Sequence, residues 1–259
     1  MTKKLVLFDL DGTLLTDEHK VLDSTKEALE ELEESGHIVM CATGRSYPLA
    51  KEIIEEVGFD NTILNNGAVA FYKGEQVYGN PLDRQAMERF ISLNREENID
   101  LIFHSLTETK RYSKNVETMT HNVMTSFGAF VPDYEEDYHV DKDIYQIVSI
   151  IEEERMVLYG EQFPEFRFVR WHDKGLDVLP YNGSKAETIK VVADQLGISR
   201  EDIVAFGDGL NDIEMLDYVG TGVAMGNARP EAKAVSNHVT ATNNDHGIAK
   251  ALKELGLIK

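Results

Sequence analysis

Short apolar runs alternate with helical patterns along much of the chain, and this alternation constrains the fold more than any other feature. Five runs have the length of buried strands: LVLFDL (5–10), HIVMCAT (37–43), NTILNN (61–66), DIVAFGD (202–208) and GTGVAM (220–225). Strands that alternate with helices are typical of a parallel sheet with helices on both faces. The sequence therefore predicts an α/β fold built on a parallel sheet.

Capping signals predict where several of the helices begin and end. A capping box at residues 24–27 predicts the start of a first helix, and Gly36 fits its C-terminal cap. A second helix is expected from about 47 to 57, and Gly58 would end it. A further capping box at 184–187 predicts a helix that runs to Leu196.

The pattern changes between about residues 81 and 180. Helices are expected over 83–97 and from about Asn115, with short strand candidates at 101–106, 111–114, 145–151, 166–171 and 176–180. Asp173-Lys174-Gly175 fits a hairpin turn between the last two strands. We therefore predict a Rossmann-like core domain of residues 1–80 and 181–259, and an inserted α/β cap domain of residues 81–180.

The chain is strongly acidic. It has 26 Lys and Arg against 46 Asp and Glu, a formal net charge of −20, and such a surface repels nucleic acid. No apolar stretch approaches the roughly 18 residues of a membrane span, and the N-terminal segment lacks the pattern of a signal peptide. We expect a cytoplasmic protein that binds neither nucleic acid nor membrane, and no feature specifies its oligomeric state.

Polar residues follow four of the predicted strands at the points where the strands end. The segments are Asp9-Leu10-Asp11-Gly12-Thr13, Thr43-Gly44-Arg45, Asn65-Asn66-Gly67 and residues 207–212, GDGLND. In an open parallel sheet, ligands bind outside the carboxyl ends of the strands. One crevice is therefore expected to collect four carboxylates, those of Asp9, Asp11, Asp208 and Asp212.

Four carboxylates require a cation. Even one pair at about 4 Å, in an effective dielectric near 20, repels by roughly 4 kcal/mol. Oxygen ligands without His or Cys at ligand spacing favour a hard ion, and Mg²⁺ is the usual one beside phosphate. We expect Mg²⁺ to be held by Asp9, Asp11, Asp208 and Asp212, whereas the scattered histidines disfavour zinc.

The first two aspartates suit phosphoryl transfer. A carboxylate has a pKa of about 4, so Asp9 can attack phosphorus at neutral pH without a general base. The aspartyl-phosphate that results needs a second acid, which protonates the departing alkoxide and then deprotonates the hydrolytic water. Asp11, two residues further on, has that expected role.

Further polar groups meet the remaining needs of phosphoryl transfer, which are positioning and charge neutralisation. The hydroxyl of Thr43, the N–H of Gly44 and the side chains of Lys185 and Asn211 are expected at the phosphate. Arg45 has two interpretations of equal weight, a contact with substrate or an ion pair with a surface acid. Asn66 and Gly67 fit a turn without a ligand better than a binding site.

Together these motifs resemble the haloacid dehalogenase superfamily of phosphatases. The resemblance rests on DLDGT at 9–13, TGR at 43–45, Lys185 at the start of a helix and GDGLND at 207–212. NNGA at 65–68, GVAMGNA at 222–228 and NNDHGIAKAL at 243–252 are similar to the Cof-type subfamily, whose large α/β cap is of the C2 type. One departure is Ala186, where the family pattern has glycine, and a helix accepts alanine readily.

The resemblance implies roles for individual residues. It implies that Asp9 is the nucleophile and Asp11 the general acid and base. It implies that Asp9, Asp208 and the backbone carbonyl of Asp11 ligate Mg²⁺. The residues that it places at the phosphate are Leu10, Thr43, Gly44, Lys185 and Asn211.

The insert offers two further sets of candidates. Lys110, Arg111 and Lys114 form the densest basic cluster, which fits a solvated hairpin better than an anion site. Arg170, Trp171 and His172 can offer a stacking surface, although tryptophan more often packs in a core.

The function predicted from these features is a Mg²⁺-dependent phosphatase of small phosphorylated metabolites, such as sugar phosphates. One alternative is a phosphomutase of the same family, which would keep the phosphoryl group in transit. Another is a receiver-like protein that accepts a phosphoryl group without hydrolysing it, which the long insert disfavours. Dehalogenation is disfavoured because it has no use for Asp11 or for a carboxylate metal site.

Overall fold

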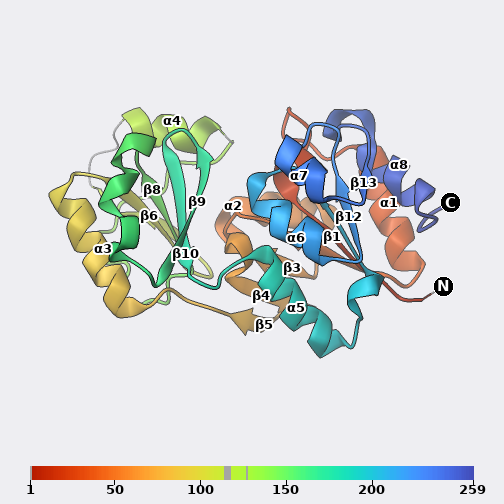
Figure 1. Ribbon diagram of the computed structural model, residues 1–259, viewed down its shortest axis with the longest axis horizontal. Helices are drawn as coiled ribbons and strands as arrows, with labels where there is room; N and C mark the ends of the chain where they lie inside the picture. Colours follow the sequence, from red (N-terminus) through yellow and green to blue (C-terminus); the bar gives the residue numbers. More distant parts are fainter. Residues whose placement is uncertain (1, 114–117, 127) are drawn as a thin grey trace. The chain divides into compact units, whose positions relative to one another are not determined.

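The computed structural model describes residues 2–113, 118–126 and 128–259, which divide into two compact units (Figure 1). The core unit comprises the chain up to Gly44, Glu52–Tyr78 and Ser184–Lys259. The insert unit comprises Arg45–Lys51 and Gly79–Gly183. Asn115, the expected start of a helix, lies outside the described residues, and helix α4 spans Thr118–Ser126.

The described part of the core unit is built on one eight-stranded sheet with the order β13-β12-β11-β1-β2-β3-β4-β5. Parallel pairs join β13 through to β3, whereas β4 pairs with β3 antiparallel. The predicted parallel α/β sheet is therefore confirmed. The strands are β1 (Leu5–Phe8), β2 (Ile38–Ala42), β3 (Thr62–Leu64), β4 (Val69–Tyr72), β5 (Glu75–Gly79), β11 (Ile203–Gly207), β12 (Thr221–Ala224) and β13 (His238–Val239).

Helices cover the core sheet on both faces because its central strands are buried on both sides. Leu5 and Leu7 pack in one cluster with Ile189 of α5. Phe8 points to the opposite face, where its ring stacks on that of Phe206 with centroids 4.9 Å apart. Helix α1 packs against β2 and α8. The helices of this region are α1 (Asp23–Glu34), α2 (Tyr47–Val57), α5 (Lys185–Leu196), α6 (Ile213–Tyr218), α7 (Pro230–Val235) and α8 (Gly247–Glu254).

The two predicted capping boxes had different outcomes. Ser184 caps α5 as expected, since its hydroxyl accepts a hydrogen bond of 3.2 Å from the N–H of Glu187. The box at residues 24–27 was wrong, because α1 begins at Asp23 and its N-cap position is Leu22. The Ser24 hydroxyl instead hydrogen-bonds the Nδ1 atom of His246, 2.6 Å away.

The insert unit contains a five-stranded antiparallel sheet with the order β7-β6-β8-β10-β9. Helix α3 and the following turns contribute to an aromatic cluster around Phe90 on one side of the sheet. Helix α4 packs its Val123 and Met124 against Ile102 and Val148 on the other side. The elements are α3 (Arg84–Glu96), β6 (Asp100–His104), β7 (Thr109–Arg111), β8 (Gln146–Ile150), β9 (Phe166–His172) and β10 (Gly175–Pro180).

Residues 45–51, which include the start of α2, group with the insert unit. Leu49 packs against the cluster that α4 forms with the insert sheet. The Ser46 hydroxyl lies 2.9 Å from Nδ1 of His104 and 3.2 Å from Oγ1 of Thr109. His104 is buried, and burial lowers its pKa to about 3, so its ring is neutral at pH 7. These contacts explain why a segment outside the predicted insert groups with it.

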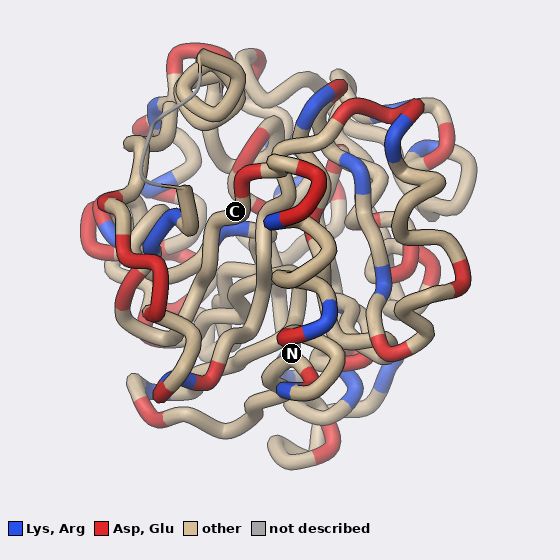
Figure 2. The backbone as a smooth tube through the Cα atoms, turned by 90° about the vertical axis from the view of Figure 1, so that its left-hand side faces the viewer, with Lys and Arg blue, Asp and Glu red and all other residues tan. Residues whose placement is uncertain are grey.

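The charged positions lie along the whole of the described chain. Figure 2 shows acidic and basic positions interspersed along the backbone, with both present in helices and in loops. Among the described residues, no helix has the length and apolar character that a bilayer span requires.

Truncation of one side chain in the core of the insert unit should strongly lower the stability of the protein. The Phe90 side chain is fully buried and contacts the rings of Tyr159, Phe163 and Phe166 at centroid distances of 4.7, 5.2 and 5.8 Å. We expect Phe90→Ala to lower the free energy of unfolding by about 3–5 kcal/mol, measured by urea denaturation. The matched control is Phe130→Ala, whose side chain is 53% exposed and whose loss should cost about 0.5 kcal/mol or less. Equal losses in the two variants would contradict this assignment of the insert core.

Candidate active site

A buried ammonium joins two aspartates at the carboxyl end of β1. Asp9 follows β1, and its N–H donates a hydrogen bond of 3.0 Å to the Phe206 carbonyl of β11. Lys185 Nζ donates to Asp9 Oδ1 over 2.6 Å and to Asp212 Oδ1 over 2.7 Å. Burial opposes the charge of Lys185, but the carboxylates of Asp212 and Asp9 outweigh it and raise the lysine pKa. The lysine is therefore a fixed positive charge in this site.

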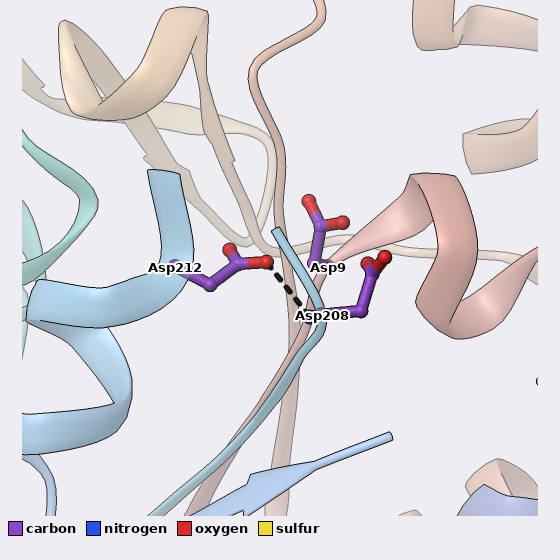
Figure 3. Close-up of side chains that lie close together, drawn as sticks. All are labelled: Asp9, Asp208 and Asp212. Carbon is purple, nitrogen blue, oxygen red and sulfur yellow. Dashed lines mark hydrogen bonds between the residues drawn. The ribbon is translucent and has the colours of Figure 1, made fainter. Parts of the chain in front are cut away.

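Asp212 also holds the loop that follows β11. Its Oδ2 atom accepts a hydrogen bond of 3.0 Å from the backbone N–H of Asp208 (Figure 3). The same atom accepts a second hydrogen bond, of 2.9 Å, from the N–H of Gly209. The side chain of Asp212 is completely buried. Both of its carboxylate oxygens thus accept hydrogen bonds, and these bonds fix the position of Asp208 relative to Lys185.

The turn of residues 10–14 brings the loop after β1 against Asp208. Gly12 has φ +74°, and a Cβ atom at this position would lie 2.7 Å from the Asp208 carboxyl carbon. Only glycine allows this approach, because any side chain would meet the carboxylate and would also strain the backbone. Thr13 adds a hydrogen bond of 3.1 Å from its hydroxyl to Asp208 Oδ1. The half-buried Asp11 lies in the same turn.

Asn66 links the other loops at this edge of the sheet. Its N–H donates to the Thr43 carbonyl over 3.1 Å, and its Oδ1 accepts from Asn211 Nδ2 over 3.0 Å. A Cβ atom on Gly44 would lie 2.9 Å from the same Oδ1 atom. The loops after β2, β3 and β11 therefore meet at one amide. The sequence favoured a simple turn here, and the NNGA motif was the available signal for a larger role.

Three carboxylates are close enough to share a cation. Oxygen atoms of Asp9, Asp208 and Asp212 lie within 4.8 Å of one another (Figure 3). Burial, and then the charge of Asp212, raises the pKa of Asp9 well above its usual value and that of Asp208 to about 7. The raised pKa values indicate that the single positive charge of Lys185 does not neutralise these carboxylates. Hard oxygen donors with such a deficit fit a divalent cation such as Mg²⁺.

Arg45 and the candidate residues of the insert lie in the insert unit. Arg45 Nη1 donates to the Leu49 carbonyl over 3.1 Å. The guanidinium of Arg111 is buried and lies 5.8 Å from the centre of the Tyr134 ring, whereas Lys114 lies outside the described residues.

The hairpin candidates of the insert make local contacts. Arg170 donates from Nη1 to the carbonyls of Ile151, His172 and Asp173, at 3.1, 3.1 and 3.0 Å. The Trp171 Nε1–H donates to Asp177 Oδ1 over 2.8 Å. These contacts give Arg170 and Trp171 structural roles in the hairpin.

Comparison with known proteins identifies the family. The family model of the haloacid dehalogenase-like hydrolases matches residues 6–252. The chain belongs to this family. The resemblance proposed from its motifs is therefore confirmed.

The similarity to known proteins covers the full length of this hydrolase. It is 40% identical over 262 residues to the candidate phosphatase YkrA of Bacillus subtilis, with 100% of both chains covered. Its structure is similar to that of the phosphatase BT1666 from Bacteroides thetaiotaomicron, with a TM-score of 0.90 and 30% identity over 99% of this chain and 96% of that one. The sugar phosphatase BT4131, of subclass IIB, gives a TM-score of 0.88 and 29% identity over 99% and 100%. The prediction of a hydrolase of the phosphatase class is confirmed.

Two asparagines of the hydrolase bond the segment of residues 10–15 and had no predicted role. Asn227 lies in the GVAMGNA motif and Asn243 in NNDHGIAKAL. Asn227 donates to the Gly12 carbonyl and Asn243 to the Leu15 carbonyl. The motifs signalled these positions, but the contacts join segments more than 200 residues apart, which spacing alone does not reveal.

The raised pKa of Asp208 predicts how the stability of the metal-free enzyme varies with pH. A group whose pKa is raised on folding stabilises the fold while it is protonated, and this stability is lost as pH rises through the folded pKa. Asp208, with a folded pKa of about 7, should therefore lower stability between about pH 4 and pH 8. In EDTA, we expect Asp208→Asn to be more stable than the wild type at pH 8 and close to it at pH 4.5.

Urea denaturation at a series of pH values would measure this difference. The expected gain at pH 8 is on the order of a few kcal/mol. Asp173→Asn, at an exposed position of the insert hairpin, is the matched control and should give no pH-dependent difference. A gain for Asp208→Asn that is the same at both pH values would contradict the electrostatic origin of the effect.

Proposed function

We propose that this protein is a Mg²⁺-dependent phosphatase of small phosphorylated metabolites that acts through an aspartyl-phosphate on Asp9. The observation that carries the proposal is the contact of 2.6 Å between Lys185 Nζ and Asp9 Oδ1 in a buried site. It supports a carboxylate held in one orientation beside a fixed cation. Such positioning and charge neutralisation supply most of the catalysis in phosphoryl transfer.

Asp9 is the nucleophile in this proposal. One of its oxygens accepts the hydrogen bond from Lys185, and the other attacks the phosphorus and forms the acyl-phosphate bond as the P–O bond to the leaving group breaks. Asp11 gives its proton to the leaving alkoxide, and then takes a proton from the water that hydrolyses the acyl-phosphate. Its half-buried position in the turn after Asp9 is compatible with access to substrate.

Asp9, Asp208 and the Asp11 carbonyl would hold Mg²⁺, and Asp212 positions Asp208 through its hydrogen bonds. Bound there, the cation would supply positive charge that neutralises the carboxylates and the phosphoryl oxygens. Thr43, Gly44, Lys185 and Asn211 are the proposed partners of the phosphoryl group, with the backbone of Leu10. Arg45 stays a candidate for a contact with substrate.

Sugar phosphates are the proposed substrates. The support is the similarity to a structure described as a sugar phosphatase, which extends over 99% of this chain. We propose that residues 81–180 act as a C2-type cap that selects the part of the substrate beyond the phosphate. The acidic composition, with a formal charge of −20, supports a small metabolite over nucleic acid as the partner.

Release of inorganic phosphate from a panel of sugar phosphates and other phosphate monoesters would test the proposal. We expect turnover with Mg²⁺, none with EDTA, and a loss of at least about 1,000-fold in Asp9→Asn, because the amide is a very weak nucleophile. Asp173→Asn, far along the chain in the insert hairpin, should keep wild-type turnover.

Other outcomes would favour the alternative functions. A phosphorylated product without inorganic phosphate would favour a phosphomutase. A stable phosphoprotein without turnover would favour a receiver-like acceptor. Undiminished phosphate release by Asp9→Asn would overturn Asp9 as the nucleophile.

A further inference from the structure

Two asparagine side chains hold the turn that carries Asp11. Asn227 Nδ2 donates to the Gly12 carbonyl over 2.7 Å, and Asn227 Oδ1 accepts from the N–H of Asn243 over 3.0 Å. Asn243 Nδ2 donates to the Leu15 carbonyl over 2.8 Å. The middle of the turn and the residue that follows it are thus bonded to one connected pair of residues.

The backbone beside Asn227 also contacts the loop that carries Asp208. The N–H of Arg229 donates to the Asp208 carbonyl over 2.9 Å. Residues 227–229 therefore bond directly to both loops, the one with Asp11 and the one with Asp208. A single short segment therefore holds the two loops beside each other through their backbone carbonyls.

Gly12 makes this support necessary. Glycine loses more conformational freedom on folding than any other residue, so a turn with glycine beside Asp11 can rotate unless other contacts hold it. The Asp208 carboxylate packs against the Cα side of Gly12, and the Asn227 amide binds its carbonyl. Because each peptide group is planar, a fixed Gly12 carbonyl limits the rotation of the backbone on either side of it.

We propose that Asn227 is a positioning residue that sets the orientation of Asp11 through the Gly12 carbonyl. Asn243 orients the Asn227 amide by donating to its oxygen, so that the amide nitrogen faces Gly12. The inference rests on the proposed function, in which Asp11 protonates the leaving group. Asn227 is exposed, so its role is in the geometry of the turn and not in the packing of the core.

The test compares two phosphate esters that differ in their need for an acid. p-Nitrophenolate leaves without protonation, whereas the alkoxide of an alkyl or sugar phosphate needs a proton. For Asn227→Ala we expect kcat/KM to fall by about three- to tenfold with the alkyl ester, the equivalent of one hydrogen bond, and to change little with p-nitrophenyl phosphate. The ratio kcat/KM is used because it reports the step in which the leaving group departs.

Asn244→Ala is the matched control. Asn244 is exposed like Asn227 and makes two side-chain hydrogen bonds, but both go to Asp17, outside the turn. Its loss should leave kcat/KM for both esters unchanged, and the two variants should have similar melting temperatures.

Asp11→Asn separates failure of the inference from failure of the proposed function. We expect it to lose far more activity with the alkyl ester than with p-nitrophenyl phosphate. Suppose that Asp11→Asn behaves in this way, but Asn227→Ala lowers kcat/KM equally for the two esters or for neither. The positioning role of Asn227 is then overturned. If Asp11→Asn itself lowers kcat/KM equally for both esters, the acid role of Asp11 is overturned, and the role of Asn227 with it.

Discussion

The contact of one buried ammonium with two carboxylates is the constraint on which the rest of the candidate site depends. Lys185 is 1% exposed, and a charge removed from water to this extent is costly unless partners surround it. Asp9 and Asp212 are those partners, at 2.6 and 2.7 Å. Because they come from the loops after β1 and β11, the ammonium holds two strands of the sheet and the start of α5 in one arrangement.

The backbone around Lys185 places its side chain beside the two carboxylates. Ser184 caps α5 just before Lys185, so the helix begins at the lysine. The loop after β3 approaches the same point, and a Cβ atom on Gly67 would lie 2.5 Å from the Ser184 carbonyl carbon. Thr188 then donates its hydroxyl to the Gly67 carbonyl. The position of the ammonium therefore also depends on a third loop, the one that follows β3.

The sequence predicted much of the fold and of this site because both depend on the ends of strands. Asp9, Asp208 and Asp212 follow buried strands at the same edge of a parallel sheet, so their meeting follows from the pattern alone. Ser46 could not be assigned in this way, because its partners His104 and Thr109 are about 60 residues further along the chain. The prediction of the start of α1 failed for a similar reason, since Ser24 bonds His246 and does not make the predicted cap. Local signals thus succeed where the geometry of the sheet brings residues together, and fail where side-chain contacts between distant segments decide.

The net charge of the candidate site is negative, so the ammonium of Lys185 alone does not suffice to attract a phosphate group. Three carboxylates, of Asp9, Asp208 and Asp212, against one ammonium leave a formal charge of −2. A dianionic phosphate ester would be repelled by such a cluster, in a chain that is itself acidic. A divalent cation bound at this cluster would bring the formal charge to zero, and oriented N–H groups could then bind the phosphate. In the proposed function, recognition of phosphate is therefore conditional on the cation, and one set of carboxylates controls both metal binding and substrate binding.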